Sequence, residues 1–177
     1  ACYNYYTPPY AAGVWSNYAA GCGATAWGQV MRHFRYPTQP MGTNVFNIRV
    51  DGVLQGRQTR GGDGNGGPYR WESMPDSPSG WSPENERQAI GALLADIGVV
   101  ATIYYASNGS SGTLSSQKLK AGFGYANSIH ADWVGAQASV YTKLKPYIAM
   151  PAWGSDHVPF LEAGIPTYLS IEHWEDH

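Results

Sequence analysis

The stretch Ala20-Gly21-Cys22-Gly23-Ala24-Thr25-Ala26 places a cysteine between two glycines, directly before a run of helix-forming residues. Glycine lets the backbone turn tightly and leaves the sulfur uncovered. We predict a helix over residues 24–34, because apolar side chains recur four apart on one face, at Ala26, Val30 and Phe34, with Trp27 and Met31 beside them. The positive end of the helix dipole favours the thiolate, which is the nucleophilic form of cysteine. The pattern indicates a catalytic Cys22, and the alternative is a small cysteine that packs the start of a helix.

The composition is that of a globular protein with few charges. The chain has 177 residues, 43% of them hydrophobic, but only 14% are charged and the formal net charge is −2. We therefore expect one domain over residues 1–177, no nucleic-acid partner and no membrane span. The 13 tyrosines, 7 tryptophans and 22 glycines, together with the low charge, favour a secreted, extracellular protein.

The chain contains two cysteines, Cys2 and Cys22. In an oxidising compartment they could form a disulfide, since their separation in sequence does not forbid it. A disulfide would remove the proposed nucleophile, whereas a free Cys2 near the chain end leaves Cys22 available.

Further elements follow from local patterns. Asp51-Gly52 predicts a hairpin turn within residues 45–54, and the glycine-rich residues 55–68 predict a mobile surface loop. Ser82-Pro83 predicts the start of a helix that Gly98 would end. We expect a strand over 99–105 and a helix over 114–122, followed by a helix over 137–145 and strands over 147–152 and 167–171. Helices that precede strands favour the α+β class.

Three blocks of sequence resemble the streptopain family of bacterial cysteine peptidases. They are Gly21-Cys22-Gly23-Ala24-Thr25-Ala26 with the residues up to Tyr36-Pro37, then Tyr69-Arg70-Trp71 with Met74-Pro75, and residues 92–125. The resemblance implies an α+β, papain-like fold, in which the helical part that carries the cysteine packs on an antiparallel sheet. The family continues with glycine-rich segments and further strands, so we expect this sheet to be truncated at its C-terminus.

The resemblance also implies a set of catalytic residues. Cys22 corresponds to the family's nucleophile, and His157 is expected to be the general base of a thiolate–imidazolium pair. Trp174 is expected to pack beside the imidazole of His157, and His173 takes the place of the family's supporting asparagine. The reaction is the hydrolysis of a polypeptide through an acyl-enzyme and needs neither a cofactor nor a metal. A propeptide or an inhibitor is a further expected partner.

Two alternatives remain open. The segment Gly154-Ser155-Asp156-His157-Val158-Pro159-Phe160 also resembles a block of the zinc aminopeptidase and glutaminyl cyclase superfamily, in which this histidine is a metal ligand. His130-Ala131-Asp132 matches the His-x-Asp pattern of further zinc ligands. The chain contains no Glu-Glu pair, however, which such a zinc site also typically needs. The other alternative is an inactive, peptidase-like binding module.

Overall fold

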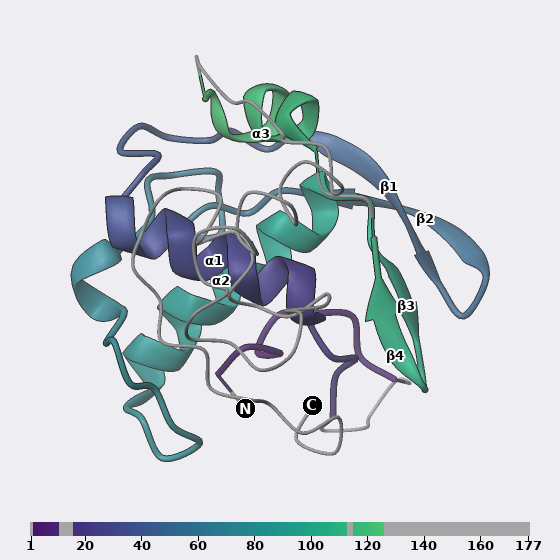
Figure 1. Ribbon diagram of the computed structural model, residues 1–177, viewed down its shortest axis with the longest axis horizontal. Helices are drawn as coiled ribbons and strands as arrows, with labels where there is room; N and C mark the ends of the chain where they lie inside the picture. Colours follow the sequence, from purple (N-terminus) through teal and green to yellow (C-terminus); the bar gives the residue numbers. More distant parts are fainter. Residues whose placement is uncertain (1, 11–15, 113–114, 126–177) are drawn as a thin grey trace, which may run out of the picture.

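The computed structural model describes residues 2–10, 16–112 and 115–125. Two long helices lie across one another beside a small sheet, and a third helix lies near one end of α2 (Figure 1). The elements are α1 (Cys22–Phe34), β1 (Val45–Val50), β2 (Val53–Gln58), the short 3-10 helix η1 (Trp71–Ser73), α2 (Glu84–Val100), β3 (Tyr104–Ala106), β4 (Gly109–Ser111) and α3 (Ser116–Phe123). The helix expected over 24–34 and the helix expected over 114–122 are confirmed within two residues at each end.

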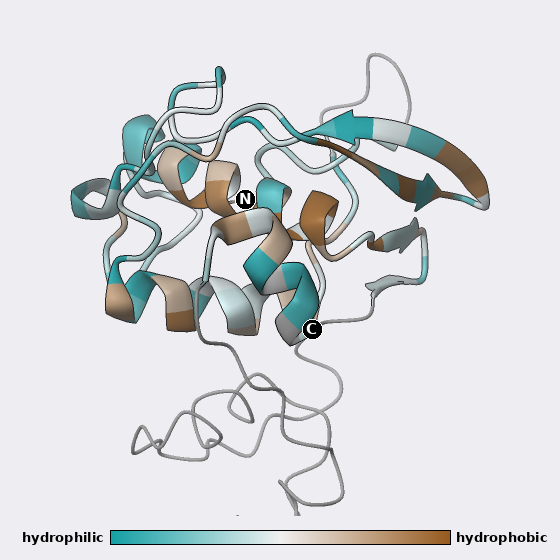
Figure 2. Ribbon diagram, turned by 90° about the horizontal axis from the view of Figure 1, so that it is seen from above, coloured by the Kyte–Doolittle hydropathy of each residue, from teal (hydrophilic) through white to brown (hydrophobic). Residues whose placement is uncertain are grey.

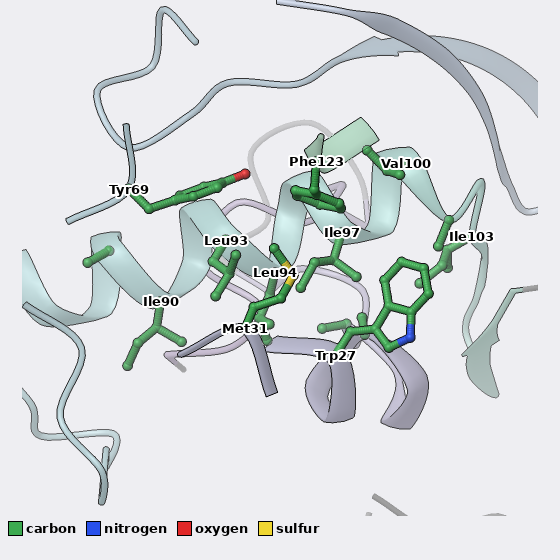
Figure 3. Close-up of a cluster of buried hydrophobic side chains, with 14 of the residues drawn as sticks. Trp27, Met31, Tyr69, Ile90, Leu93, Leu94, Ile97, Val100, Ile103 and Phe123 are labelled. Atoms are coloured by element: carbon green, nitrogen blue, oxygen red, sulfur yellow. The ribbon is translucent and has the colours of Figure 1, made fainter. Parts of the chain in front are cut away.

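The contact between α1 and α2 forms the centre of the core. Trp27 and Met31 of α1 face the buried side chains of α2 (Figure 3). Between them, a Cβ at Gly28 would lie only 2.4 Å from the Leu94 Cδ2 atom, so the missing side chain lets the helices approach closely. The buried face of α1 therefore includes Gly28, whereas Phe34, expected on the apolar face, is 55% exposed.

Helix α2 is buried along most of its length. Every residue from 89 to 100 is buried, because α1, the sheet and α3 all contact this helix. The helix begins at Glu84 without a side-chain cap and runs past Gly98 to Val100, so the expected end at Gly98 is wrong. Gly98 instead makes room for a neighbour, since a Cβ there would lie 2.0 Å from the Tyr105 hydroxyl oxygen. The strand expected from residue 99 begins only at Tyr104.

The sheet contains four strands in the order β2-β1-β3-β4. β1 pairs antiparallel with β2 and β3 pairs antiparallel with β4, but β1 and β3 are parallel. The α+β class is confirmed for the described residues, with one correction: the sheet is mixed and not purely antiparallel. The reason is that α2 lies in the connection from β2 to β3 and returns the chain in the direction of β1.

The expected hairpin around Asp51-Gly52 is confirmed, and it extends beyond the helices (Figure 2). The surface loop expected over 55–68 is wrong in two respects. Residues 55–58 complete β2, and Thr59, Gly61 and Gly66 are buried. Their burial follows from backbone-to-backbone packing, because a Cβ at Gly61 would lie 2.3 Å from the carbonyl oxygen of Gly67.

A buried carboxylate ties this glycine-rich loop to α2. The Asp96 side chain is 0% exposed and accepts hydrogen bonds from the N–H groups of Arg60 (2.7 Å) and Gly61 (2.8 Å) and from the Tyr69 hydroxyl (2.7 Å). Burial raises the pKa of Asp96, and these hydrogen bonds offset part of the rise. Without Asp96 the buried N–H of Gly61 would lack its acceptor, and Arg60 and Tyr69 would each lose a hydrogen bond to α2, so Asp96 fixes the path of the loop.

We predict that Asp96→Ala lowers the free energy of unfolding by about 3 kcal/mol or more, because it removes the shared acceptor of three hydrogen bonds and leaves the buried N–H of Gly61 unsatisfied. Urea denaturation measures the change. Asp76→Ala is the matched control, since Asp76 pairs with Arg32 at 3.3 Å on the surface and its side chain is 93% exposed. Equal effects of the two substitutions would contradict the structural role of Asp96.

Candidate active site

Cys22 is the first residue of α1 and is exposed, as the sequence predicts. Its thiol is free. Gly21 precedes it as the N-cap, with φ 88° and ψ 150°, and no side chain caps the helix. The first turn also carries no acidic residue. The sulfur therefore lies at an uncapped helix N-terminus, where the helix dipole and the backbone N–H groups favour negative charge.

The first turn is closed by the residue three positions after the cysteine. Both the N–H and the Oγ1 hydroxyl of Thr25 donate to the carbonyl oxygen of Gly21 at 3.1 Å. Within the described residues, the N–H of Cys22 donates a hydrogen bond to no backbone or side-chain acceptor. This N–H is free to donate to an oxygen of a bound molecule, as an oxyanion hole requires.

The hairpin of β3 and β4 packs directly against the residue before the cysteine. A Cβ at Gly21 would lie 3.0 Å from the Ser110 carbonyl oxygen and 3.3 Å from the Ser110 Cβ. The positive φ of Gly21 is a second requirement for glycine, because other residues are strained there. Position 21 thus requires glycine for two reasons: its φ is positive, and β4 leaves too little space for a side chain.

The residues before the cysteine are anchored through a buried tyrosine. The hydroxyl of Tyr18 donates to Asp51 Oδ2 in the β1–β2 turn, and this hydrogen bond is the main reason that the pKa of Tyr18 is raised to about 12. The Tyr18 carbonyl oxygen accepts a hydrogen bond from the Thr7 hydroxyl at 2.5 Å. These contacts could not be predicted from the sequence, because pairs of residues that are distant in sequence leave no periodic pattern.

The second cysteine is not bonded to the first. Cys2 is free and buried, and its Sγ donates to the carbonyl oxygen of Ser79 at 2.7 Å. The disulfide between Cys2 and Cys22 that the sequence left open is therefore not formed, and Cys22 keeps its thiol.

His33, the one histidine among the described residues, lies far from the cysteine. It is exposed in the last turn of α1, and its ring centroid is 4.9 Å from that of Phe34. It lies eleven positions after Cys22 along the helix, or about 16 Å at 1.5 Å per residue. His33 is thus not placed to exchange a proton with the Cys22 thiol.

The remaining predicted site residues lie outside the described residues. They are His157, His173 and Trp174, and also His130 and Asp132 of the zinc alternative. Over residues 2–10, 16–112 and 115–125, no three His, Cys, Asp or Glu side chains gather in a group that could hold a metal ion. In the same ranges no helix has the length and apolar character to cross a membrane.

We predict that Gly21→Ala destabilises the protein more than Gly52→Ala. Both glycines have positive φ, at 88° and 83°, but only Gly21 has a neighbour within 4 Å of the added Cβ. A positive φ costs alanine about 1–3 kcal/mol at either site, and the contact with Ser110 adds to it at Gly21. Urea denaturation gives both values, and equal costs would show that β4 does not constrain Gly21.

Comparison with known proteins finds related sequences among bacterial thiol proteases. Streptopain of Streptococcus pyogenes is 29% identical over 122 residues, which cover 63% of this chain and 29% of streptopain. The thiol protease/hemagglutinin PrtT of Porphyromonas gingivalis is 34% identical over 113 residues, which cover 62% of this chain and 12% of PrtT. The chain thus spans well under half the length of these relatives.

Solved structures show the same fold. The active wild-type interpain A cysteine protease of Prevotella intermedia matches with a TM-score of 0.57 and 25% identity, over 80% of this chain and 61% of that one. A fragment of prointerpain A from the same organism matches with a TM-score of 0.54 and 26% identity, over 70% of this chain and 39% of the fragment. A family model, described as the Peptidase C10 family, matches residues 1–171, which include the segment around His157. The chain therefore belongs to the Peptidase C10 family.

Proposed function

We propose that this chain forms a single peptidase domain over residues 1–177 and hydrolyses peptide bonds with Cys22 as the nucleophile. One observation carries the proposal: the exposed, free thiol of Cys22 lies at the uncapped N-terminus of α1. This is the environment that activates a cysteine. Membership of the Peptidase C10 family supports the same chemistry.

In the proposed mechanism the Cys22 thiolate attacks the carbonyl carbon of a peptide, and the N–H of Cys22 donates to the developing oxyanion. The imidazolium of His157 then gives its proton to the leaving amine, and a thioester with Cys22 remains. Water, deprotonated by the neutral imidazole, attacks the thioester and releases the acid. In this proposal Trp174 packs beside the imidazole of His157, and His173 orients that imidazole.

The substrate class in this proposal is the polypeptide, and the proposed location is outside the cell. The relatives are named as proteases, and one matching structure is of a proenzyme fragment. A propeptide or an inhibitor is therefore proposed as a second partner that would cover the Cys22 end of α1. The low charge of the chain, 14% of residues, supports the extracellular location.

The zinc alternative assigns the role of metal ligand to His157. The family match argues against it, because its bounds, residues 1–171, include the segment around His157. The two assignments differ in what a chelator does, since the thiol mechanism uses no metal, whereas the zinc mechanism loses its Lewis acid.

We predict that Cys22→Ala abolishes hydrolysis of an unstructured protein substrate such as casein. We also predict that His157→Ala lowers kcat by about 100-fold or more, because proton transfer by a positioned group contributes 10²–10⁴. His33→Ala is the matched histidine control and retains wild-type turnover. Release of casein peptides, normalised to folded protein, is the measurement.

Three results would contradict the proposal. Unchanged hydrolysis in Cys22→Ala would exclude the thiol as the nucleophile. Activity lost to a chelator and restored by zinc would favour the metalloenzyme. A folded wild-type chain that binds casein without cleaving it would favour the binding module.

A further inference from the structure

Two side chains hold the peptide unit between Ala19 and Ala20, two residues ahead of Cys22. The hydroxyl of Ser110 donates to the carbonyl oxygen of Ala19 at 2.6 Å, and the N–H of Ala20 donates to Oδ1 of Asn4 at 2.8 Å. A peptide unit is planar, so one hydrogen bond at its C=O and another at its N–H fix the orientation of the whole plane.

Asn4 is itself fixed in place. Its carbonyl oxygen accepts hydrogen bonds from Asn17 Nδ2 at 2.8 Å and from the Thr7 hydroxyl at 3.1 Å. Asn17 also pairs with Pro9 in an antiparallel bridge, so residues 4–10 and 16–20 lie side by side. The acceptor that holds the Ala20 N–H thus belongs to a small, cross-linked unit.

Ser110 is fixed by the sheet. It pairs with Tyr105 across the β3–β4 hairpin, and Tyr105 pairs with Val50 of β1. Tyr105 is only 1% exposed, which anchors the hairpin in the core. The two groups that hold the peptide therefore come from two separately anchored parts of the fold.

The backbone of Ala20, which is 2% exposed, and of Gly21 connects this peptide to the nucleophile. The freedom of Gly21 to rotate is limited, because the Ser110 carbonyl oxygen lies 3.0 Å from where a Cβ of Gly21 would be and its φ is 88°. The orientation of the held peptide is consequently passed on to the N–H of Cys22. A donor for an oxyanion needs such fixed placement, since its effect depends on being aimed before the reaction begins.

We propose that Asn4 and Ser110 are positioning residues, which act together through the Ala19–Ala20 peptide to hold the N–H and the sulfur of Cys22 in the orientation that the reaction needs. Neither residue touches the reacting atoms in this proposal. The inference rests on the proposed function, because it concerns the turnover of the same nucleophile.

The test compares Asn4→Leu and Ser110→Ala with two matched controls. Asn4→Asp keeps an acceptor oxygen, and Ser111→Ala removes the hydroxyl of the next, exposed serine of β4. Casein hydrolysis is measured per active site, titrated with a thiol-directed irreversible inhibitor. We expect kcat to fall by about 10-fold or more in Asn4→Leu and Ser110→Ala, since misplacement by 1 Å costs up to about 10²-fold. KM should change less than twofold, and both controls should match the wild type.

The double variant tests whether the two residues act on one peptide. Loss of either hydrogen bond frees the same plane, so we expect the double variant to lose much less than the product of the two single losses. Hydrogen exchange at the Ala20 amide should accelerate in Asn4→Leu and Ser110→Ala but not in the controls, which reports the loosened peptide without using activity.

The outcomes separate this inference from the proposed function. A wild-type chain that neither cleaves casein nor reacts with the thiol inhibitor contradicts the proposed function and the inference together. An active wild type, with variants that keep kcat per titrated site and lose only thermal stability, overturns the inference alone. Loss of turnover in Asn4→Asp equal to that in Asn4→Leu also overturns it, because the acceptor would then be irrelevant.

Discussion

Close packing of α1 on α2 is the constraint on which the arrangement of the site depends. The hydrogen atom at Gly28 lets the Leu94 side chain occupy space that a Cβ would fill. Because α2 is buried from residue 89 to residue 100, it offers α1 a fixed support. The N-terminus of α1 then emerges beside β4, with Cys22 exposed at its first position. A core contact thus determines where the thiol lies.

Local patterns in the sequence predicted the elements that depend on local interactions. The helix after Cys22, the hairpin at Asp51-Gly52 and the helix that follows Ser82-Pro83 were predicted from apolar spacing, turn residues and helix-start residues. The ends of α2 were predicted wrongly, because Gly98 serves the contact with Tyr105 and does not end the helix. Helix ends depend on tertiary contacts that propensity does not contain.

In the candidate site, too, the features that depend on local sequence were predictable and those that depend on distant contacts were not. The exposure of Cys22 at a helix start was predictable from its flanking glycines, whereas the supports around it were not. The contacts of Asn4 and Ser110 join residues 16 and 91 positions apart. The glycine-rich loop held by Asp96 was expected to be a mobile surface segment for a similar reason, since the burial of a glycine depends on what packs against it. Such side-chain-to-backbone contacts carry no repeat that the sequence alone reveals.

The central claim is that Cys22 forms a covalent intermediate with its substrate. Rapid acid quenching of the reaction with an activated acyl ester, followed by peptide mapping by mass spectrometry, tests it most directly. We expect the acyl mass to appear on the peptide that contains Cys22, at up to one equivalent per chain, and to disappear as product forms. Turnover of the ester without any acyl mass on Cys22, or with that mass on another residue, would contradict the account.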